Sequence, residues 1–442
     1  MQKKRLYLIF SLLIMASMIL AACGGAAPPA EEVGEEAPAA EEEMAEEEMA
    51  EEEMAEEEMA EEPANPGLQM ESAAVAQQFW DDALYEESIE LLEAEPINPE
   101  DPIYLQSLVD NKVDTSEFEM EPPYDICFSN AGVNNTWRVT GYVTMREQVE
   151  QLRDEGLVRN FIHVDAEGSD EKQIADIEDL LAGGQCDALI VSPNTSEALT
   201  PAVEQACEQL PVVVFDRGVQ TDCPTTFLKT IGGYAFGYTG AQFIVENLPE
   251  GGDVLALRIL PGVDVLEQRW GAAREVFEDA GNINVIGVEF GTYSNPETKD
   301  IVTDYLDRYG SIDAIWMDAG GTAIGALEAF EDAGLPYPVM VGEDQMDYLK
   351  FWKENDLTAI APTFPTFQWR TAVLAAVMIL QGEPVDARWV LPQPNITQEN
   401  LDDFYLPDMP PLYYAMSSAE DMDNWPDAWM ELDTTKYQDV IE

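Results

Sequence analysis

The sequence predicts an α/β protein with two doubly wound parallel-sheet lobes. From about residue 122 onward, short continuous apolar runs alternate with segments of helical period, which is typical of parallel strands covered by helices on both faces. The alternation restarts after Gly232-Gly233. The two sets together cover about 270 residues, more than one compact core commonly holds, so we expect two lobes. The predicted strands lie at 126–129, 161–164, 188–192 and 212–215 in the first set, and at 254–260, 285–290, 314–317 and 339–341 in the second.

The start of the chain has the order of a secretion signal. A basic stretch at 3–5 precedes an apolar run over 6–20, which is shorter than the roughly twenty residues that span a bilayer. Leu-Ala-Ala then precedes Cys23, an order that resembles the bacterial lipobox, in which this cysteine becomes the first mature residue and is acylated. A cleaved signal with an incidental cysteine and an uncleaved anchor are the alternatives. We expect residues 1–22 to be a signal peptide and the mature protein to be extracytoplasmic, anchored to the cell membrane through Cys23.

Residues 23–66 are predicted to be the lipid anchor and a tether. Glu-Glu-Glu-Met-Ala occurs four times between Glu41 and Ala60, and the segment has almost nothing to bury. Such a composition forms no core, and its like charges extend the chain. A transient helix is compatible with Glu, Met and Ala, but the five-residue period gives it no continuous apolar stripe. We interpret the segment as a solvated spacer.

Net charge limits the possible partners. The chain has 88 acidic and 21 basic residues, which gives a formal net charge of −67. An anionic protein of this kind repels nucleic acids and anionic lipid surfaces. We therefore expect no nucleic-acid partner.

Besides Cys23, the sequence has four cysteines, an even number that suits disulfides in an oxidising compartment. Cys207 and Cys223 flank one predicted strand, and a bond between them would stabilise the fold by about 3 kcal/mol in the chain-entropy treatment. We favour that pair. Cys127 and Cys186 open neighbouring predicted strands, so they either pair or remain two buried thiols.

Polar and aromatic side chains follow the predicted strands at one rim. In open parallel sheets, ligands bind beyond the carboxyl ends of the strands. Aromatic faces, arginines and carboxylates together suit a polyhydroxylated ring, because the aromatics stack on its C–H surface while Arg and Asp fork onto adjacent hydroxyls. Any one of these residues could instead have a packing, salt-bridge or capping role. The binding hypothesis therefore depends on their lying together at one rim. The residues are Asn135, Trp137, Arg138, Asp216, Arg217, Arg269, Trp270, Tyr293, Asp318, Glu343 and Asp344.

Motifs for catalysis and metal binding are missing from the sequence. His163 is the sole histidine and lies within a predicted strand, so neither a His-based triad nor a multi-histidine metal site can form. The sequence contains no Gly-x-Ser-x-Gly nucleophile elbow and no Gly-Lys-Thr/Ser phosphate loop. Asp421, Asp423 and Asp427 lack the glycine and terminal glutamate of a calcium-binding EF-hand loop, so we expect a solvated turn there. We therefore expect a protein that is not an enzyme and that holds no metal and no cofactor.

An ordered series of short motifs points to one family. The motifs are Asn-Thr-Trp-Arg at 135–138, Ser-Pro-Asn at 192–194, Val-Phe-Asp-Arg at 214–217, Gln-Arg at 268–269, Tyr293 and Gly-Glu-Asp at 342–344. With them, roughly residues 122–395 resemble the type I periplasmic binding proteins of sugar importers, particularly the ribose- and galactofuranose-binding group. The resemblance implies a ligand-binding set made of Asn135, Trp137, Arg138, Asp216, Arg217, Arg269, Tyr293, Asp318, Asp344 and Thr363.

Two positions depart from the family pattern. Where the family usually has Asn-Asp after the Ala-Ile-Trp strand, this chain has Asp-Ala-Gly-Gly at 318–321, so Asp318 would replace an amide contact. Thr363 stands where ribose binders place a glutamine. Both departures leave the identity of the sugar open.

The resemblance also implies a domain organisation and a function. The implied function is to capture a monosaccharide or polyol by hinge closure and to deliver it to the permease of an ABC importer. The protein is expected to be a monomer. A lipoprotein sensor that signals to a membrane receptor is the alternative, with the same fold. The expected crossings between lobes lie near 231–232, 364–365 and 391–392. The expected domains are a helical N-terminal extension at 67–121 that packs on a lobe, lobe 1 at 122–231 plus 365–391, lobe 2 at 232–364, and a C-terminal crossing with an aromatic tail at 392–442.

Overall fold

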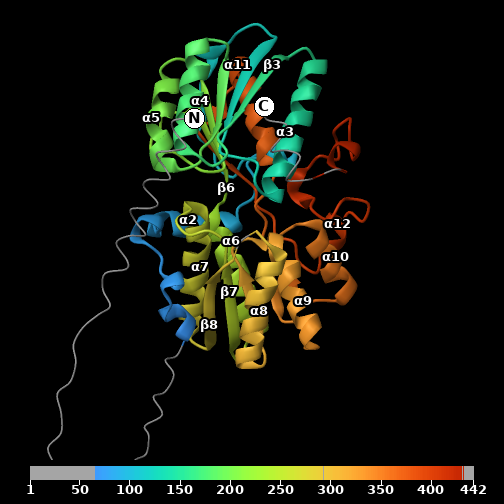
Figure 1. The fold of residues 1–442 in the computed structure, drawn as a ribbon. Helices are drawn as coiled ribbons and strands as arrows, with labels where there is room; N and C mark the ends of the chain where they lie inside the picture. Colours follow the sequence, from blue (N-terminus) through green and yellow to red (C-terminus); the bar gives the residue numbers. More distant parts are fainter. Residues whose placement is uncertain (1–64, 292, 431, 433–442) are drawn as a thin grey trace, which may run out of the picture. The chain divides into compact units, whose positions relative to one another are not determined.

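A computed structural model describes residues 65–291, 293–430 and 432 (Figure 1). The predicted signal peptide, Cys23 and the Glu-Met-Ala repeats lie outside these residues. Within the described ranges, no helix is both long and apolar enough to cross a membrane. The described chain forms two parallel sheets with helices packed around them, which we call lobe 1 and lobe 2. The predicted fold class is thereby confirmed.

Lobe 1 is built, in the described residues, on a six-stranded sheet with the order β13-β6-β5-β4-β2-β3, and each neighbouring pair is parallel. Every residue of β4 and β5 is buried, as expected of central parallel strands covered on both faces. Strand β2 has β3 on one side and β4 on the other, which makes its carboxyl end a topological switch point where ligands bind in such sheets. The strands are β2 (Tyr124–Asn130), β3 (Val158–Asp165), β4 (Ala188–Ser192), β5 (Val212–Phe215), β6 (Thr226–Thr230) and β13 (Arg388–Leu391), and the helices are α3 (Thr136–Asp154), α4 (Asp170–Gly183), α5 (Ser196–Cys207) and α11 (Gln368–Leu380).

Lobe 2 has, among the described residues, a five-stranded parallel sheet with the order β11-β10-β9-β7-β8. Its switch point is β7, which lies between β8 and β9. The strands are β7 (Gly252–Arg258), β8 (Ile283–Phe290), β9 (Ala314–Met317), β10 (Val339–Val341) and β11 (Ala359–Ile360), and the helices are α6 (Gly233–Asn247), α7 (Asp264–Ala280), α8 (Asn295–Tyr309), α9 (Ala323–Ala333) and α10 (Met346–Asn355).

Local signals in the sequence set the ends of several helices. Asn135 Oδ1 accepts a hydrogen bond from the backbone N–H of Arg138 (2.9 Å) and so starts α3 directly after the loop from β2. Ser169 caps α4 in the same way, with its hydroxyl oxygen 3.2 Å from the N of Lys172. Gly281 ends α7 in the left-handed conformation, which glycine adopts without steric cost.

The segments that cross between the lobes are bonded to one another. The backbone N–H of Gly232 donates to Gln393 Oε1 (2.9 Å), which joins the first crossing to the third. Ala361 and Ile396 form an antiparallel bridge that joins the second crossing to the third. The three crossing segments are therefore bonded into one unit and are not independent of one another.

The N-terminal extension contacts both lobes, although we expected it to pack on one. Its α-helical part is α2 (Asp82–Leu92), and the rest is short 3-10 turns, loops and strand β1 (Lys112–Val113). Between α2 and β1, prolines interrupt helical structure. On lobe 2, Arg258 Nη1 donates to the carbonyl of Ser72 (2.7 Å). On lobe 1, β1 pairs antiparallel with β12 (Val385–Asp386). In Figure 1, α2 lies at the junction of the lobes, on the side away from α12 (Leu401–Phe404).

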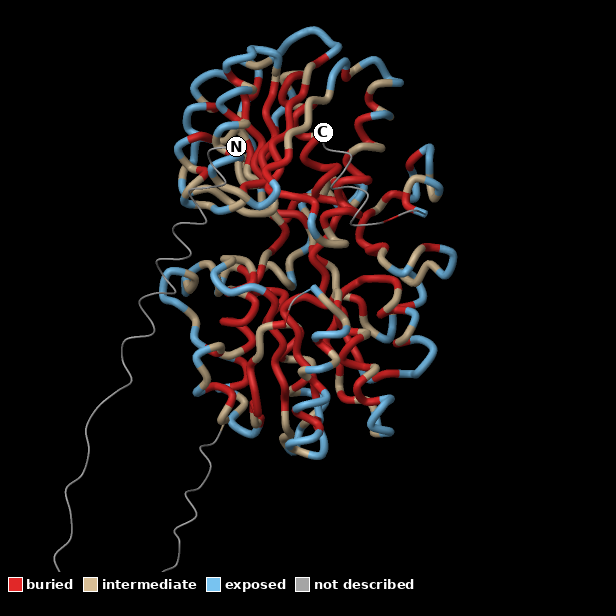
Figure 2. The backbone as a smooth tube through the Cα atoms, viewed as in Figure 1, coloured by how far each residue is buried: buried red, intermediate tan, exposed pale blue. Residues whose placement is uncertain are grey.

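The core of lobe 1 is aromatic and depends on the start of α11. The Trp369 ring makes edge contacts with Phe128 and Phe215, at ring-centroid distances of 5.8 and 5.1 Å. A Cβ on Gly141 would lie 2.3 Å from the Trp369 ring, so α3 needs a glycine at this close approach. In Figure 2 the central strands of both sheets are buried, whereas the outer turns of the helices carry exposed residues.

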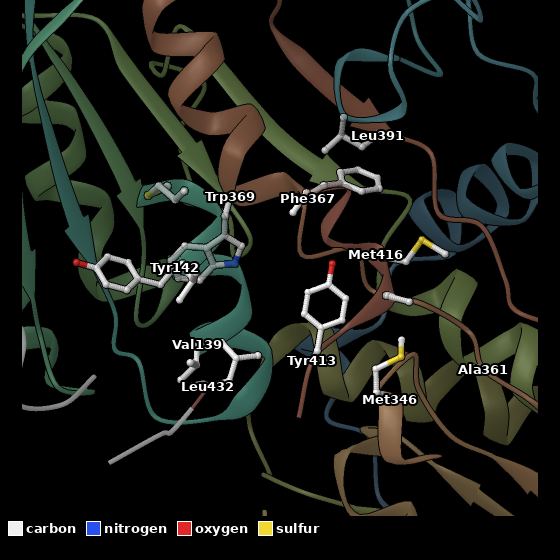
Figure 3. Close-up of a cluster of buried hydrophobic side chains, with 14 of the residues drawn as sticks. Val139, Tyr142, Met346, Ala361, Phe367, Trp369, Leu391, Tyr413, Met416 and Leu432 are labelled. Atoms are coloured by element: carbon white, nitrogen blue, oxygen red, sulfur yellow. The ribbon is translucent and has the colours of Figure 1, made fainter. Parts of the chain in front are cut away.

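The C-terminal segment, which we define as residues 410–429, joins a hydrophobic cluster that includes residues of both lobes. Figure 3 shows Tyr413 and Met416 of this segment together with Met346 of α10, and with Phe367 and Trp369 at the start of α11. All five side chains are buried. The segment that we expected to be an aromatic tail is therefore packed into the protein over these residues.

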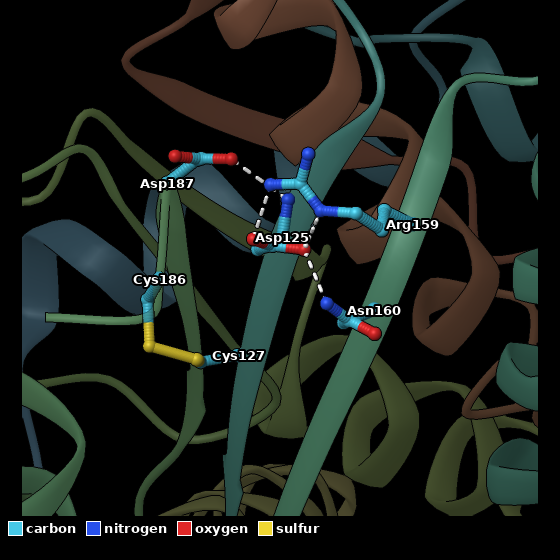
Figure 4. The surroundings of a disulfide bond; sticks show 6 residues. All are labelled: Asp125, Cys127, Arg159, Asn160, Cys186 and Asp187. Carbon is cyan, nitrogen blue, oxygen red and sulfur yellow. Dashed lines mark hydrogen bonds and ion pairs between the residues drawn. A yellow bond between two sulfur atoms is a disulfide. The ribbon is translucent and has the colours of Figure 1, made fainter. Parts of the chain in front are cut away.

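The described cysteines form two disulfides. Cys207 is bonded to Cys223, and Cys127 is bonded to Cys186, which resolves the alternatives left open for the second pair. Cys127 and Cys186 are separated by 59 residues, and closing a loop of that length stabilises by about 4 kcal/mol in the chain-entropy treatment. Beside this bond, Arg159 on β3 pairs with Asp125 on β2 (Figure 4).

Candidate ligand-binding site

A cavity of about 260 Å³ lies between the carboxyl ends of strands from both lobes. It adjoins a larger cavity of about 860 Å³, with which it shares several wall residues, among them Asp216, Arg217 and Phe364. Its wall in lobe 1 consists of residues 134–138, Asp216 and Arg217; its wall in lobe 2 consists of Leu260, Val263, Val265, Leu266, Arg269, Tyr293, Asn295, Ala319, Gly321 and Glu343; the remaining residues are Phe364, Leu412 and Tyr414.

An ion pair in lobe 1 forms one side of the cavity. Arg138, in the first turn of α3, places Nη2 2.6 Å from Asp216 Oδ2, and both side chains are only 5% exposed. Asp216 follows β5 directly and has a φ of +68°, a left-handed conformation that is uncommon outside glycine and is often found at functional sites. The guanidinium of Arg138 also lies over the rings of Trp137 and Trp369, at 5.7 and 6.0 Å from their centroids.

Trp137 and Arg217 complete the wall of lobe 1. Trp137 Nε1 donates to the carbonyl of Phe364 (2.6 Å), so the first turn of α3 is bonded to the second crossing. Arg217 Nη1 donates to the carbonyl of Asn194, at the loop that follows β4. Both side chains are held by backbone carbonyls and still line the cavity.

Arg269 on α7 forms the matching feature in lobe 2. Its guanidinium carbon lies 3.9 Å from the ring centroid of Phe236 and 4.9 Å from that of Phe364, so the cation is held between two aromatic rings. Its Nη1 donates to the carbonyl of Asp318 and lies 3.4 Å from Glu343 Oε1. Each lobe thus brings an arginine, a nearby carboxylate and aromatic faces to the cavity.

Comparison with known proteins assigns the family. Residues 126–384, more than half of the chain, match the periplasmic binding protein domain. The chain belongs to the periplasmic binding protein family. The match spans both sheets apart from the first two residues of β2 and strand β13.

Curated relatives of this periplasmic binding protein are similar over most of their own length. The ribose import binding protein RbsB of Bacillus subtilis is 26% identical over 264 residues, which cover 59% of this chain and 83% of the relative. The galactofuranose-binding protein YtfQ of Escherichia coli is 21% identical over 227 residues, which cover 50% of this chain and 70% of the relative.

Solved structures support the same fold. An ABC transporter solute binding protein from Thermobispora bispora has a TM-score of 0.60 and 23% identity, and the match covers 68% of this chain and 95% of that one. A solute binding protein from Actinobacillus succinogenes with bound D-allose has a TM-score of 0.55 and 22% identity, covering 64% of this chain and all of the other. At these identities the likeness concerns the fold alone.

The expected ligand-binding residues of this periplasmic binding protein divide into two groups. The structure brings seven of them to the cavity wall: Asn135, Trp137, Arg138, Asp216, Arg217, Arg269 and Tyr293. The side chains of Asp318, Asp344 and Thr363 do not line it, because each bonds to backbone elsewhere. Thr363 Oγ1 donates to the carbonyl of Pro394 and so links the second and third crossings.

Asp318 and Asp344 are buried behind the cavity. Asp318 Oδ2 accepts from the backbone N–H of Ile259 (3.2 Å), and Asp344 Oδ2 accepts from that of Met416 (2.7 Å). The other carboxylate oxygen of each residue has no hydrogen-bond partner among the described residues. Burial raises the pKa of both carboxyls to about 7, and the charge of Glu343 adds to the rise for each.

Phe364, Leu412 and Tyr414 line the cavity without having been expected there, and Glu343, expected at the rim but not in the implied ligand-binding set, lines it too. Glu343 was visible in the Gly-Glu-Asp motif, but the spacing alone does not say which of two adjacent acids faces the ligand. Leu412 and Tyr414 lie in the C-terminal segment, where the family pattern gave no equivalent position. Their contribution depends on a contact between distant parts of the chain, which a local motif does not reveal.

The site offers hydrogen-bonding and stacking groups. Among the described residues, no cluster of three or more His, Cys, Asp or Glu side chains could hold a metal ion. His163 stacks on Phe128, with ring centroids 5.0 Å apart, and burial lowers its pKa to about 3. It is therefore neutral at physiological pH and forms part of the packing of lobe 1.

Proposed function

We propose that this periplasmic binding protein captures a monosaccharide or a polyol of similar size in the cavity between its lobes and delivers it to the permease of an ABC importer. The observation that carries the proposal is the pairing of Arg138 with Asp216 in lobe 1 and of Arg269 with Glu343 in lobe 2, on opposite walls of one small cavity. Forked arginines and carboxylates bond to adjacent hydroxyls, and aromatic faces contact the C–H surface of a sugar ring.

The names of similar proteins support this ligand class. RbsB and YtfQ are named for ribose and galactofuranose, and solved structures of similar fold hold D-allose and myo-inositol. These ligands share a small ring with several hydroxyl groups. For this chain, we propose the class and not one member of it.

Hinge closure is the proposed mechanism. A ligand that bonds to both walls makes its full set of contacts only when the lobes are close, so it binds the closed state more tightly and shifts the population toward it. A permease that recognises the closed surface then receives loaded protein. We further propose that the working protein is extracytoplasmic and lipidated at Cys23, a location supported by the order of residues 1–24 and by the two disulfides.

Ligand screening of the purified protein tests the function. A panel of pentoses, hexoses and inositols is added at millimolar concentration while the melting temperature is recorded, because a ligand that binds only the folded state raises its stability. We expect at least one member to raise the melting temperature, with calorimetry confirming one site per chain. The Arg138→Ala variant, with the guanidinium removed from the cavity, serves as the control and should show no shift. Failure of every panel member to shift the wild-type protein would contradict the proposal.

A further inference from the structure

The C-terminal segment enters the proposed ligand-binding cavity. Leu412 and Tyr414 both line it. Tyr414 forms an antiparallel bridge with Gln345, and the backbone N–H of Met346 donates to the carbonyl of Tyr413 (2.9 Å). The segment is therefore bonded to lobe 2 at the loop after β10 by one isolated bridge and an adjacent backbone hydrogen bond, which hold the backbone of Tyr414 beside the cavity.

The hydroxyl of Tyr414 lies between groups from both lobes. A Cβ built on Gly321 would have the Tyr414 hydroxyl oxygen at 3.2 Å and Thr136 Oγ1, at the start of α3 in lobe 1, at 3.9 Å. Glu343 of lobe 2 lines the same cavity. Tyr414 as a whole is only 3% exposed. A tyrosine hydroxyl both donates and accepts, so in this cavity wall it can bond to a ligand hydroxyl in either sense.

The loop after β9 leaves room for this tyrosine. A Cβ on Gly321 would lie 3.2 Å from the hydroxyl oxygen of Tyr414, and a Cβ on Gly320 would lie 2.1 Å from the backbone N of Glu343. Side chains at these two positions would therefore crowd Tyr414 and Glu343. The Gly-Gly pair offers no side chain of its own to a ligand, and Tyr414 occupies the space beside it.

The rest of the segment is anchored on lobe 1. Arg370 Nη1 on α11 lies 2.8 Å from Asp421 Oδ1, and Trp429 Nε1 donates to Thr144 Oγ1 on α3 (3.2 Å). The backbone N–H of Phe367 donates to the carbonyl of Met416 (2.9 Å). Tyr414 thus belongs to a segment that is bonded to lobe 2 at one end and to lobe 1 at the other.

We propose that Tyr414 is a specificity-determining ligand contact, supplied by the C-terminal segment in place of a side chain from the loop after β9. The proposal rests on the sugar-binding function proposed above. The hydroxyl of Tyr414 bonds to one ligand hydroxyl next to Glu343, and the Tyr414 ring with Leu412 forms the wall that limits ligand size at this end of the cavity. The set of sugars accepted by this protein is therefore determined partly by residues outside the matched domain.

Two substitutions separate the hydroxyl from the wall. Tyr414→Phe removes only the hydroxyl, and we expect about 3- to 10-fold weaker binding of the best panel ligand, the scale of one uncharged hydrogen bond. Tyr414→Ala opens the wall, and we expect a changed rank order in which a larger panel member gains relative to the best wild-type ligand. Tyr337→Phe is the matched control, because its hydroxyl bonds to Glu331 at an exposed site on lobe 2. Affinities are measured by calorimetry on the full chain, with circular dichroism as the check of folding.

Amide exchange gives a second measurement that needs no substitution. Ligand should slow exchange in residues 409–417, because a ligand bonded to Tyr414 holds the segment on lobe 2. Unchanged affinity and rank order in both Tyr414 variants, together with loss of binding in Arg138→Ala, would overturn the proposal and leave the sugar-binding function intact. A wild-type protein that binds no panel member would overturn the function, and this proposal would fall with it.

Discussion

Asp216 Oδ2 lies 2.6 Å from Arg138 Nη2, although the two residues are 78 positions apart in the sequence. Both side chains are nearly excluded from water. The ion pair closes one side of the cavity and depends on the left-handed backbone of Asp216. Its removal should therefore affect both stability and ligand affinity.

Asp216→Ala should destabilise the protein by about 3 kcal/mol or more, because it leaves the buried guanidinium of Arg138 without its carboxylate. It should also weaken binding of the best panel ligand at least tenfold. Asp216→Asn is the matched control: its amide oxygen still accepts from Arg138, and asparagine tolerates the positive φ. We expect Asp216→Asn to lose less stability than Asp216→Ala in urea unfolding, and to lose less ligand affinity in calorimetry. A ligand affinity of Asp216→Ala within twofold of wild type would exclude Asp216 from the binding set.

The pH dependence of stability should reflect the buried carboxyl of Asp344. Its folded-state pKa is raised to about 7, above its ordinary value of about 3.9, by burial and then by the charge of Glu343. The stabilisation from this group is fully present below about pH 4 and is lost as the pH rises through 7. The melting temperature should therefore fall between pH 5 and pH 8.

Asp344→Asn should flatten this profile, since its amide oxygen can accept from the backbone N–H of Met416 and carries no charge. Burial also raises the pKa of Asp318 and of Glu343, so the slope should decrease without vanishing. The exposed Asp307→Asn substitution is the control. Equal slopes for wild type and Asp344→Asn, in melting curves recorded at pH 5, 6, 7 and 8, would argue against a buried ionisable group at this position.

Ligand should make the protein more compact in solution. We expect a smaller radius of gyration by small-angle scattering when saturating ligand is added to residues 61–442. This range removes the repeats and retains the hydrogen bond from the backbone N–H of Val285 to Asn65 Oδ1. Bonds from the C-terminal segment to both lobes should keep the change small. An unchanged radius, in a sample shown by calorimetry to bind, would indicate a rigid binding protein.

Membrane attachment should depend on Cys23. In the producing cell, Cys23→Ala should move the protein from the membrane fraction to the soluble fraction or the medium, because acyl chains supply the membrane affinity. Mass spectrometry of the wild-type N-terminus should show the acylated cysteine. Undiminished attachment of the Cys23→Ala protein would favour an uncleaved signal helix.

The apolar runs predicted eight of the eleven described strands of the two sheets, whereas β6, β11 and β13 gave no such signal. The predicted runs at 188–192, 212–215, 314–317 and 339–341 coincide with β4, β5, β9 and β10, whose residues are buried except for the partly buried Val339. Strand β6 was not predicted, because it alternates buried and partly buried residues and includes Lys229. Strand β11 is only two residues long. Strand β13 becomes recognisable as a strand only from its pairing with β6, which the sequence does not show.

The sequence predicts which residues lie at the rim, but it does not predict the direction in which each side chain points. Arg138, Asp216 and Arg269 follow strands and line the cavity, as the topology requires. Asp318 and Asp344 follow strands too, yet their carboxylates turn toward backbone N–H groups that lie far away in the sequence. A local motif could not predict that Tyr414 lines the cavity, because its position depends on the bridge to Gln345, which is distant in the sequence.

The lobes are completed in the reverse of their order along the chain. Strand β13 and helix α11 belong to lobe 1, but they follow every strand of lobe 2. As the chain is synthesised, lobe 2 therefore has its whole sheet before lobe 1 receives its last edge strand. Until α11 is made, Phe128 and Phe215 lack the Trp369 ring that they pack against. A nascent chain at this stage exposes an aromatic surface, which is where we expect a chaperone to bind and premature aggregation to begin.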